Sequence, residues 1–246
     1  MRKGIFLLVL SLLLSLTAGG GWAAPLTMAP DLAGRVEIPL TDGGVNYVYS
    51  YAYPQLEAGD GSAELINTFY QSLARDAEEF EIPMNADYYR GQQPAQDVTV
   101  DITYEITCNN EEFFSVLLHT RQGTLRTVAG HVFSRKGIKA GSSVALPYLL
   151  ALLDSGESDT WLQDRQTARA DAAVREMVWD SLQCREDVSL LEDLDREALE
   201  YVFFPEEDFY LDESGNPVFY LQPGVADGGE DLLVFPFTVE DILDEM

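Results

Sequence analysis

A strict alternation of apolar and polar side chains over residues 98–107 (VTVDITYEIT) constrains the fold more than any other feature of the chain. Successive side chains of a β-strand point to opposite faces, so the alternation predicts a half-buried strand with one face in water. Polar breaks at Asn109–Asn110 and Gln122–Gly123 separate this strand from two more apolar runs, 113–120 and 125–134. Three consecutive strands joined by short breaks predict an antiparallel meander.

Two other regions carry strand patterns. Tyrosines stand at every second position from 47 to 53, namely Tyr47, Tyr49, Tyr51 and Tyr53. This alternation predicts a strand that ends at Pro54. Near the C-terminus, aromatic and apolar residues flank the polar stretch 212–216, which predicts a hairpin of two paired strands, 210–211 and 219–221, with that stretch as the turn. A further strand is expected over 232–237.

Helical spacing of apolar residues predicts the remaining elements. An amphipathic helix is expected over 64–80 with Ser62 as its N-cap, and another around 170–182. Leu146 opens a short helix, the acidic run 186–200 forms the solvated face of a third, and Thr238 with Asp241 forms a capping box for a last helical turn. The prediction is an α+β fold: an antiparallel sheet, made of the meander plus the C-terminal hairpin, packed with amphipathic helices and without βαβ alternation.

The N-terminus has the pattern of an export signal. Arg2 and Lys3 precede an apolar run over 5–16 and then small residues, and the run is shorter than the roughly 20 residues that a membrane span needs. We predict a signal peptide over 1–23 that is cleaved between Ala23 and Ala24, a short tether over 24–35 and a single domain over 36–246. The location is then extracytoplasmic, secreted or at the cell surface, with membrane contact only if the signal segment is retained.

Charge limits the partners. Lysine and arginine number 15 against 42 aspartates and glutamates, a net charge of −27, and loss of residues 1–23 leaves 13 against 42, or −29. Such a surface repels nucleic acid and attracts cations and basic proteins. The same acidity is also compatible with a structural or cation-buffering surface protein, or with solubility alone.

Few residues suggest chemistry. Cys108 and Cys184 are the only cysteines, and in an exported protein they form either a disulfide or two unrelated thiols. His119 and His131 fall on adjacent predicted strands without a metal-ligand spacing, and the acidic cluster over 227–231 lacks the periodicity of a calcium loop. The sequence contains no nucleophile elbow, phosphate loop or dinucleotide motif. We therefore expect no cofactor, no metal and no enzymatic activity.

Several segments, in order, resemble the RsiV-like domain, which forms the outer part of RsiV-type anti-sigma factors and the N-terminal part of PdaC-type peptidoglycan deacetylases. The resemblance runs from about residue 36 to 243. It rests on YPQL (53–56) with a helical Asn, AGH (129–131), IKAG (138–141), the FYL…G…VFY pattern (209–220) and FPF (235–237). The motif residues are Tyr53, Pro54, Asn67, His131, Gly141, Phe209, Gly215, Phe219 and Pro236.

The resemblance implies an exported binding or sensor domain, since RsiV-type domains bind lysozyme, and a strongly acidic chain suits such a cationic partner. The chain departs from the family pattern at 222–227 and at Gly137–Ile138, and no motif fixes the lysozyme-contacting residues. We expect a stand-alone domain, with neither a sigma-binding part nor a deacetylase module. A cell-wall component is the other expected partner. The alternatives are a cell-envelope, peptidoglycan-modifying enzyme or accessory that uses His131, and an acidic structural protein.

Overall fold

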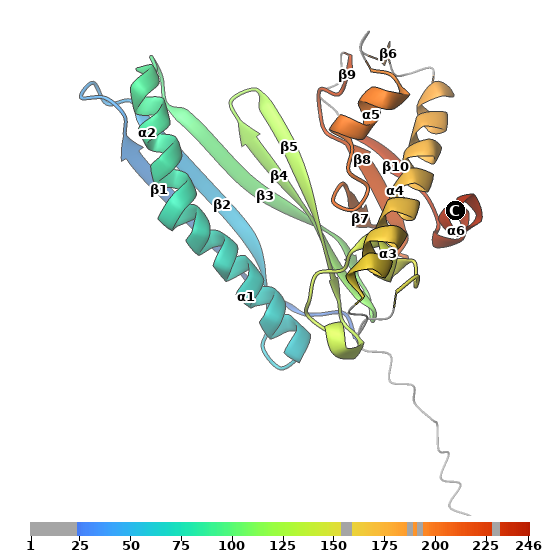
Figure 1. The fold of residues 1–246 in the computed structure, drawn as a ribbon. Helices are drawn as coiled ribbons and strands as arrows, with labels where there is room; N and C mark the ends of the chain where they lie inside the picture. The colour runs from blue at the N-terminus through green and yellow to red at the C-terminus, as the bar shows by residue number, and fades with distance from the viewer. Residues whose placement is uncertain (1–23, 154–158, 186–188, 191–193, 228–231) are drawn as a thin grey trace, which may run out of the picture.

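The computed structural model describes residues 24–153, 159–185, 189–190, 194–227 and 232–246, which form two lobes (Figure 1). The N-terminal lobe is a five-stranded sheet with its strands in chain order. The last three strands pair antiparallel, so the predicted meander is confirmed, and the last of these three has the predicted bounds, 125–134. The strands are β1 (Met28–Pro39), β2 (Asn46–Leu56), β3 (Val98–Asn109), β4 (Phe113–Gln122) and β5 (Leu125–Ser134).

The pair β2–β3 is parallel, and here the expectation of no βαβ unit is wrong. The connection is one long helical rod made of α1 (Gly61–Asp76), the π-helical turn η1 (Ala77–Glu81) and α2 (Ile82–Gln92). Parallel neighbours need such a crossover, and this one lies along one face of the sheet. The helix cap is also shifted, because the side chain of Asp60, not that of Ser62, accepts a hydrogen bond from the Ser62 backbone N at 2.8 Å.

The predicted tether over 24–35 is wrong from residue 28 onward, where edge strand β1 pairs antiparallel with β2. Pro30 and Gly34 hid this strand from the sequence pattern, since both residues are rare in strand interiors and are tolerated at an edge. Gly34 has a packing role, because a Cβ atom there would lie 2.4 Å from the ring of Tyr51 on the neighbouring strand. Strand β2 also continues two residues beyond Pro54.

The core of the N-terminal lobe is aromatic. The four alternating tyrosines of β2 all point to the face that the helical rod covers and are at most 7% exposed. Tyr53 stacks on Tyr70 of α1 with ring centroids 5.8 Å apart, and the buried Ile66 lies in the same cluster. The period-two pattern in the sequence therefore marks the face of β2 that packs against the helical rod, while Val48 and Pro54 on the other face are buried as well.

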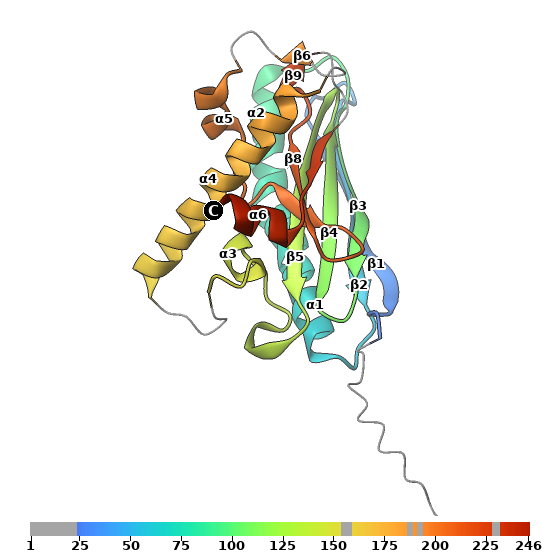
Figure 2. The same cartoon turned by 90° about the vertical axis from the view of Figure 1, so that its right-hand side faces the viewer.

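The C-terminal lobe packs four helices against a small sheet of order β10-β8-β7 (Figure 2). The predicted hairpin is confirmed: Asp212 N donates to Asn216 O at 2.9 Å across a turn that contains Gly215 at φ 86°. The Thr238–Asp241 capping box is also present. The elements are α3 (Leu146–Leu149), α4 (Thr160–Gln183), α5 (Arg196–Val202), α6 (Val239–Glu245), β7 (Phe209–Leu211), β8 (Pro217–Leu221) and β10 (Leu233–Pro236).

The predicted helix over 186–200 is only partly found. Its C-terminal part is α5, which starts at Arg196, whereas Ser189–Leu190 forms the short strand β6 and pairs with β9 (Ala226–Asp227). Residues 186–188 and 191–193 lie outside the described residues, as does the predicted signal peptide over 1–23. Within the described ranges, no helix is long and apolar enough to cross a membrane.

Candidate binding groove at the seam between the lobes

The two lobes meet where the backbones of β5 and β7 almost touch. A Cβ atom on Gly130 would lie 1.8 Å from the carbonyl oxygen of Phe209, so only glycine allows this approach. Beside it, Leu211 N donates to the hydroxyl of Ser115 on β4 at 3.0 Å, in a fully buried contact. The small sheet of the C-terminal lobe therefore sits directly on the end of the large sheet.

Side chains from β8 and the segment after it cover the outer edge of β5. Gly130 N donates to the hydroxyl of Tyr220 at 2.9 Å. The amide of Gln222 brackets Val128, accepting from its N at 3.0 Å and donating to its O at 2.8 Å. β5 is the last strand of its sheet, and these contacts satisfy backbone groups that an edge strand would otherwise expose.

A groove of about 400 Å³ lies along this edge. One wall is the acidic run Glu206, Glu207 and Asp208, which we call the acidic wall. Within the described part of the chain, no lysine or arginine lines the groove. Glu206 and Glu207 are exposed, whereas Asp208 is buried and its carboxylate accepts from Phe204 N at 2.8 Å. Burial raises the pKa of Asp208. The remaining lining residues are Val128, Ala129, Gly130, His131, Val132, Ser143, Val144, Phe209, Tyr220 and Gln222.

The acidic wall is rigidly placed and leads on from an exposed aromatic pair. Glu207 N and Asp208 N both donate to Phe204 O, at 2.8 and 2.7 Å, which closes a tight turn after α5. Tyr201 on α5 and Phe204 in the turn are 74% and 44% exposed. Exposed aromatic side chains beside charged groups are typical of protein-binding surfaces, where they act as anchors.

The field of the acidic wall reaches into the C-terminal core. Asp171 on α4 is buried, its Oδ1 makes no hydrogen bond, and its Oδ2 lies 3.8 Å from the guanidinium of Arg175. Burial, together with the charge of Glu206, raises the pKa of Asp171 to about 6, against the opposing effect of Arg175. The negative charge of Glu206 therefore acts beyond the groove, on the carboxylate of Asp171.

The two histidines point to opposite faces of the sheet. His131 pairs with Val116, whereas His119 pairs with Val128, so the adjacent strands place the two rings on different sides. The His131 ring packs edge-on to Phe69 at 5.1 Å, its Nδ1 lies 3.3 Å from the hydroxyl of Tyr70, and burial lowers its pKa to about 4. Among the described contacts, none joins His131 to a carboxylate. The pair cannot share a ligand.

The family-motif residues are spread over both lobes. Asn67 brackets Leu56 through two backbone contacts of 2.9 Å, and a Cβ atom on Gly141 would lie 2.6 Å from Leu65. Phe209 and Phe219 contact each other in the C-terminal core, with centroids 5.9 Å apart. His131 and Phe209 line the groove; the others that lie elsewhere are Tyr53, Pro54, Asn67, Gly141, Gly215, Phe219 and Pro236.

Sequence reasoning missed the acidic wall. The run Glu206–Asp208 was one acidic stretch among many, although its position directly before the FYL strand was a usable signal. Within the described residues, no group of three or more His, Cys, Asp or Glu side chains could hold a metal. The cluster over 227–231 lies largely outside those residues.

Of the two alternatives for Cys108 and Cys184, a disulfide or two unrelated thiols, the structure has the second, with both thiols free. A bulge between Ile106 and Cys108 turns Cys108 into the core of the C-terminal lobe, where burial raises its pKa to about 11. Cys184 is exposed at the end of α4. The wide sequence separation gave no information on proximity.

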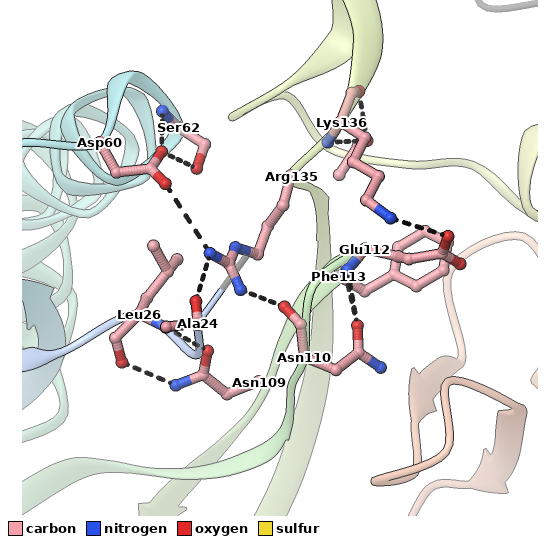
Figure 3. A network of polar contacts seen from close by, with 11 residues as sticks. Ala24, Leu26, Asp60, Ser62, Asn109, Asn110, Glu112, Phe113, Arg135 and Lys136 are labelled. Carbon is pink, nitrogen blue, oxygen red and sulfur yellow. Dashed lines mark hydrogen bonds and ion pairs between the residues drawn. The ribbon is translucent and has the colours of Figure 1, made fainter. Parts of the chain in front are cut away.

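A buried arginine holds the segment that follows the predicted cleavage site (Figure 3). The side chain of Arg135 is 2% exposed, donates to Asn110 O and to Ala24 O, the latter at 2.9 Å, and lies 3.7 Å from the carboxylate of Asp60. Asn109 brackets Leu26 through contacts of 2.8 and 2.9 Å. The chain is therefore anchored to the N-terminal lobe from Ala24 onward.

No family model and no curated protein matches this chain. Among solved structures, it is similar to a member of the DUF3298 family from Bacteroides fragilis NCTC 9343, with 11% identity and a TM-score of 0.52 over 88% of this chain and 92% of the other. A DUF3298 family protein from Pseudomonas aeruginosa PAO1 gives 10% identity and a TM-score of 0.46 over 89% and 94%. The first likeness shows a shared α+β fold, in agreement with the predicted fold class.

Proposed function

We propose that this chain is an exported, non-enzymatic binding domain of the RsiV-like type that recognises a basic protein such as lysozyme. The observation that carries the proposal is the groove at the seam, whose acidic wall presents two exposed carboxylates, Glu206 and Glu207, beside the buried Asp208. Among the described residues that line the groove, none is basic. The fold supports it as well, because RsiV-like domains are related to DUF3298 proteins.

The groove suits a cationic side chain for electrostatic reasons. An arginine or lysine of the partner would enter the groove and pair with Glu206 and Glu207, which are exposed and keep their charge accessible. Tyr201 and Phe204 would pack against the apolar surroundings of that side chain. The net charge of −29 after signal removal would speed the encounter with a basic partner.

Titration of the mature chain with lysozyme at low and at physiological salt tests the proposal. The double variant Glu206→Gln/Glu207→Gln should weaken binding about tenfold, the scale of a lost charge-assisted contact. Asp76→Asn/Glu79→Gln, which removes the same charge from the exposed surface of the helical rod, is the matched control and should change affinity less than twofold.

Three outcomes decide between the interpretations. Absence of binding at both salt concentrations would overturn recognition of lysozyme and leave the cell-wall component as the partner to test. Equal weakening by both double variants would show general attraction of cations by an acidic surface protein. Weaker binding of the Glu206→Gln/Glu207→Gln variant, with unchanged binding of the control variant, would support a defined epitope at the acidic wall.

A further inference from the structure

We infer that the loop after β5 carries a second binding site, a pocket for a small carboxylate with an apolar substituent. The pocket has a volume of about 240 Å³ and lies between the short 3-10 turn η2 (Gly137–Lys139), the segment 143–145 and α3. It shares Ser143 and Val144 with the groove but has the opposite charge. Its lining residues are Phe113, Ser134, Lys136, Lys139, Ser143, Val144, Ala145, Tyr148 and Leu153.

The lysines of the chain are concentrated here. The sequence contains only three, and Lys3 belongs to the predicted signal peptide. The other two, Lys136 and Lys139, both line this pocket. In a chain with 42 acidic residues, two lysines in one small pocket form a local exception to the charge of the molecule.

The two ammonium groups are held differently. Lys136 Nζ lies 3.2 Å from the carboxylate of Glu112 (Figure 3). It also lies 3.7 Å from that of Glu111, so its charge is already compensated. Lys139 Nζ instead lies 5.1 Å from the ring centroid of Tyr148, and no ion pair of Lys139 is found within the described part of the chain. An aromatic face orients an ammonium group without neutralising it. Lys139 Nζ is therefore available to pair with an anion in the pocket.

The other walls define the rest of the ligand. Tyr148 is held in place, since its hydroxyl accepts from Gln163 at 3.2 Å. The hydroxyl groups of Ser134 and Ser143 can donate hydrogen bonds to a carboxylate. The apolar side chains of the pocket match a small hydrocarbon group; they are Phe113, Val144, Ala145 and Leu153. A polyanion would be repelled by the surrounding acidic surface, so a single carboxylate is favoured. The free C-terminus of a short peptide with small apolar side chains has this chemistry, as has a short fatty acid.

Chemical-shift titration of the mature chain with N-acetyl-alanyl-alanine, its C-terminal carboxamide and hexanoate tests the inference. The free dipeptide should bind saturably, with shifts centred on residues 139–148, and the carboxamide at least fivefold more weakly. Lys139→Met should weaken binding at least fivefold. Arg75→Met, which removes one positive charge from the exposed surface of α1 and outside the pocket lining, is the matched control and should change binding less than twofold. If hexanoate binds as tightly as the dipeptide, the ligand is an apolar carboxylate in general; if it binds more weakly, the peptide C-terminus is the source.

The inference is overturned if neither carboxylate saturates by about 10 mM, if the carboxamide binds equally, or if Lys139→Met has no effect. The comparison between carboxylate and carboxamide uses the unaltered chain, so it holds even if a variant does not fold. The test is independent of lysozyme recognition, because neither lysine belongs to the acidic wall.

Discussion

The two lobes have cores of different chemistry. The N-terminal core is built around tyrosines from β2 and α1, and the half-buried imidazole of His131 packs at its margin against Phe69 and Tyr70. The C-terminal core consists of aliphatic and phenylalanine side chains and has the buried carboxylate of Asp171 at its margin. The pKa of His131 is lowered and that of Asp171 is raised, so acid changes their contributions to stability in opposite directions. The groove lies at the seam where the two cores meet. The C-terminal core also uses Cys108 of β3 and Val132 of β5, so the large sheet contributes to both cores, and the shape of the groove depends on how closely the lobes approach.

Gly130→Ala should have the largest effect, because the new Cβ would collide with the Phe209 carbonyl and force the lobes apart. We expect the free energy of unfolding to fall by about 3 kcal/mol, the upper range for overpacking. Chemical denaturation measures this. The matched control is Gly91→Ala in α2, where a Cβ would meet nothing within 4 Å. It should raise stability by about 0.5–1 kcal/mol, since alanine is the better helix former. A harmless Gly130→Ala would show that the seam is loose.

The N-terminal core should lose stability in acid. The folded-state pKa of His131 is about 4, below its ordinary 6.5, so only the unfolded chain takes up this proton in between. The contribution is fully present above pH 6.5 and is lost as the pH falls toward 4. The loss should be roughly 2 kcal/mol, less than the full shift would give, because solvent screens the half-buried ring. His131→Phe should flatten this part of the pH profile in denaturant titrations. A variant that keeps the wild-type profile would place the acid sensitivity elsewhere.

The C-terminal core should show the reverse sign. The pKa of Asp171 is raised from 3.8 to about 6, so the folded state binds the proton more tightly than the unfolded state. Its cost in stability is absent below pH 4 and develops as the pH rises through 6. Asp171→Asn should therefore stabilise the protein at pH 7 by roughly 1 kcal/mol and have little effect at pH 4. Stabilisation that is equal at both pH values would refute the role of this proton.

Reduction with dithiothreitol should leave the stability of the protein unchanged, the smallest effect among these tests. Since Cys108 and Cys184 are unpaired, dithiothreitol should leave the denaturation midpoint unchanged. A thiol reagent should label one cysteine in the native state, the exposed Cys184, and two after denaturation. A drop of the midpoint on reduction would mean that the cysteines do pair.

Local patterns allowed much of the fold to be predicted. The alternation over 98–107, the bounds of β5 and the capping box at Thr238 depend on neighbours in sequence, so residue order alone carries them. Strand β1 was not predicted, because its proline and glycine are rare in strand interiors and are tolerated only at an edge. The parallel pairing of β2 with β3 depends on a helical rod whose packing the sequence does not specify.

The candidate site was beyond such patterns. Its acidic wall starts at Glu206, while the opposite wall is the edge of β5 near Gly130, so the groove exists only through long-range packing. Of the motif residues, His131 and Phe209 do line it. A single sequence could not distinguish Glu206 and Glu207 from 40 other acidic side chains, because their role depends on what faces them.

Hydrogen exchange of the mature chain with and without lysozyme tests the central claim most directly. The account predicts that bound lysozyme slows exchange over residues 200–208 and along the β5 edge, 128–132, which together frame the groove. Protection confined to the opposite surface of the molecule, where α2 and the preceding turn expose Phe80, Met84 and Tyr88, would contradict it.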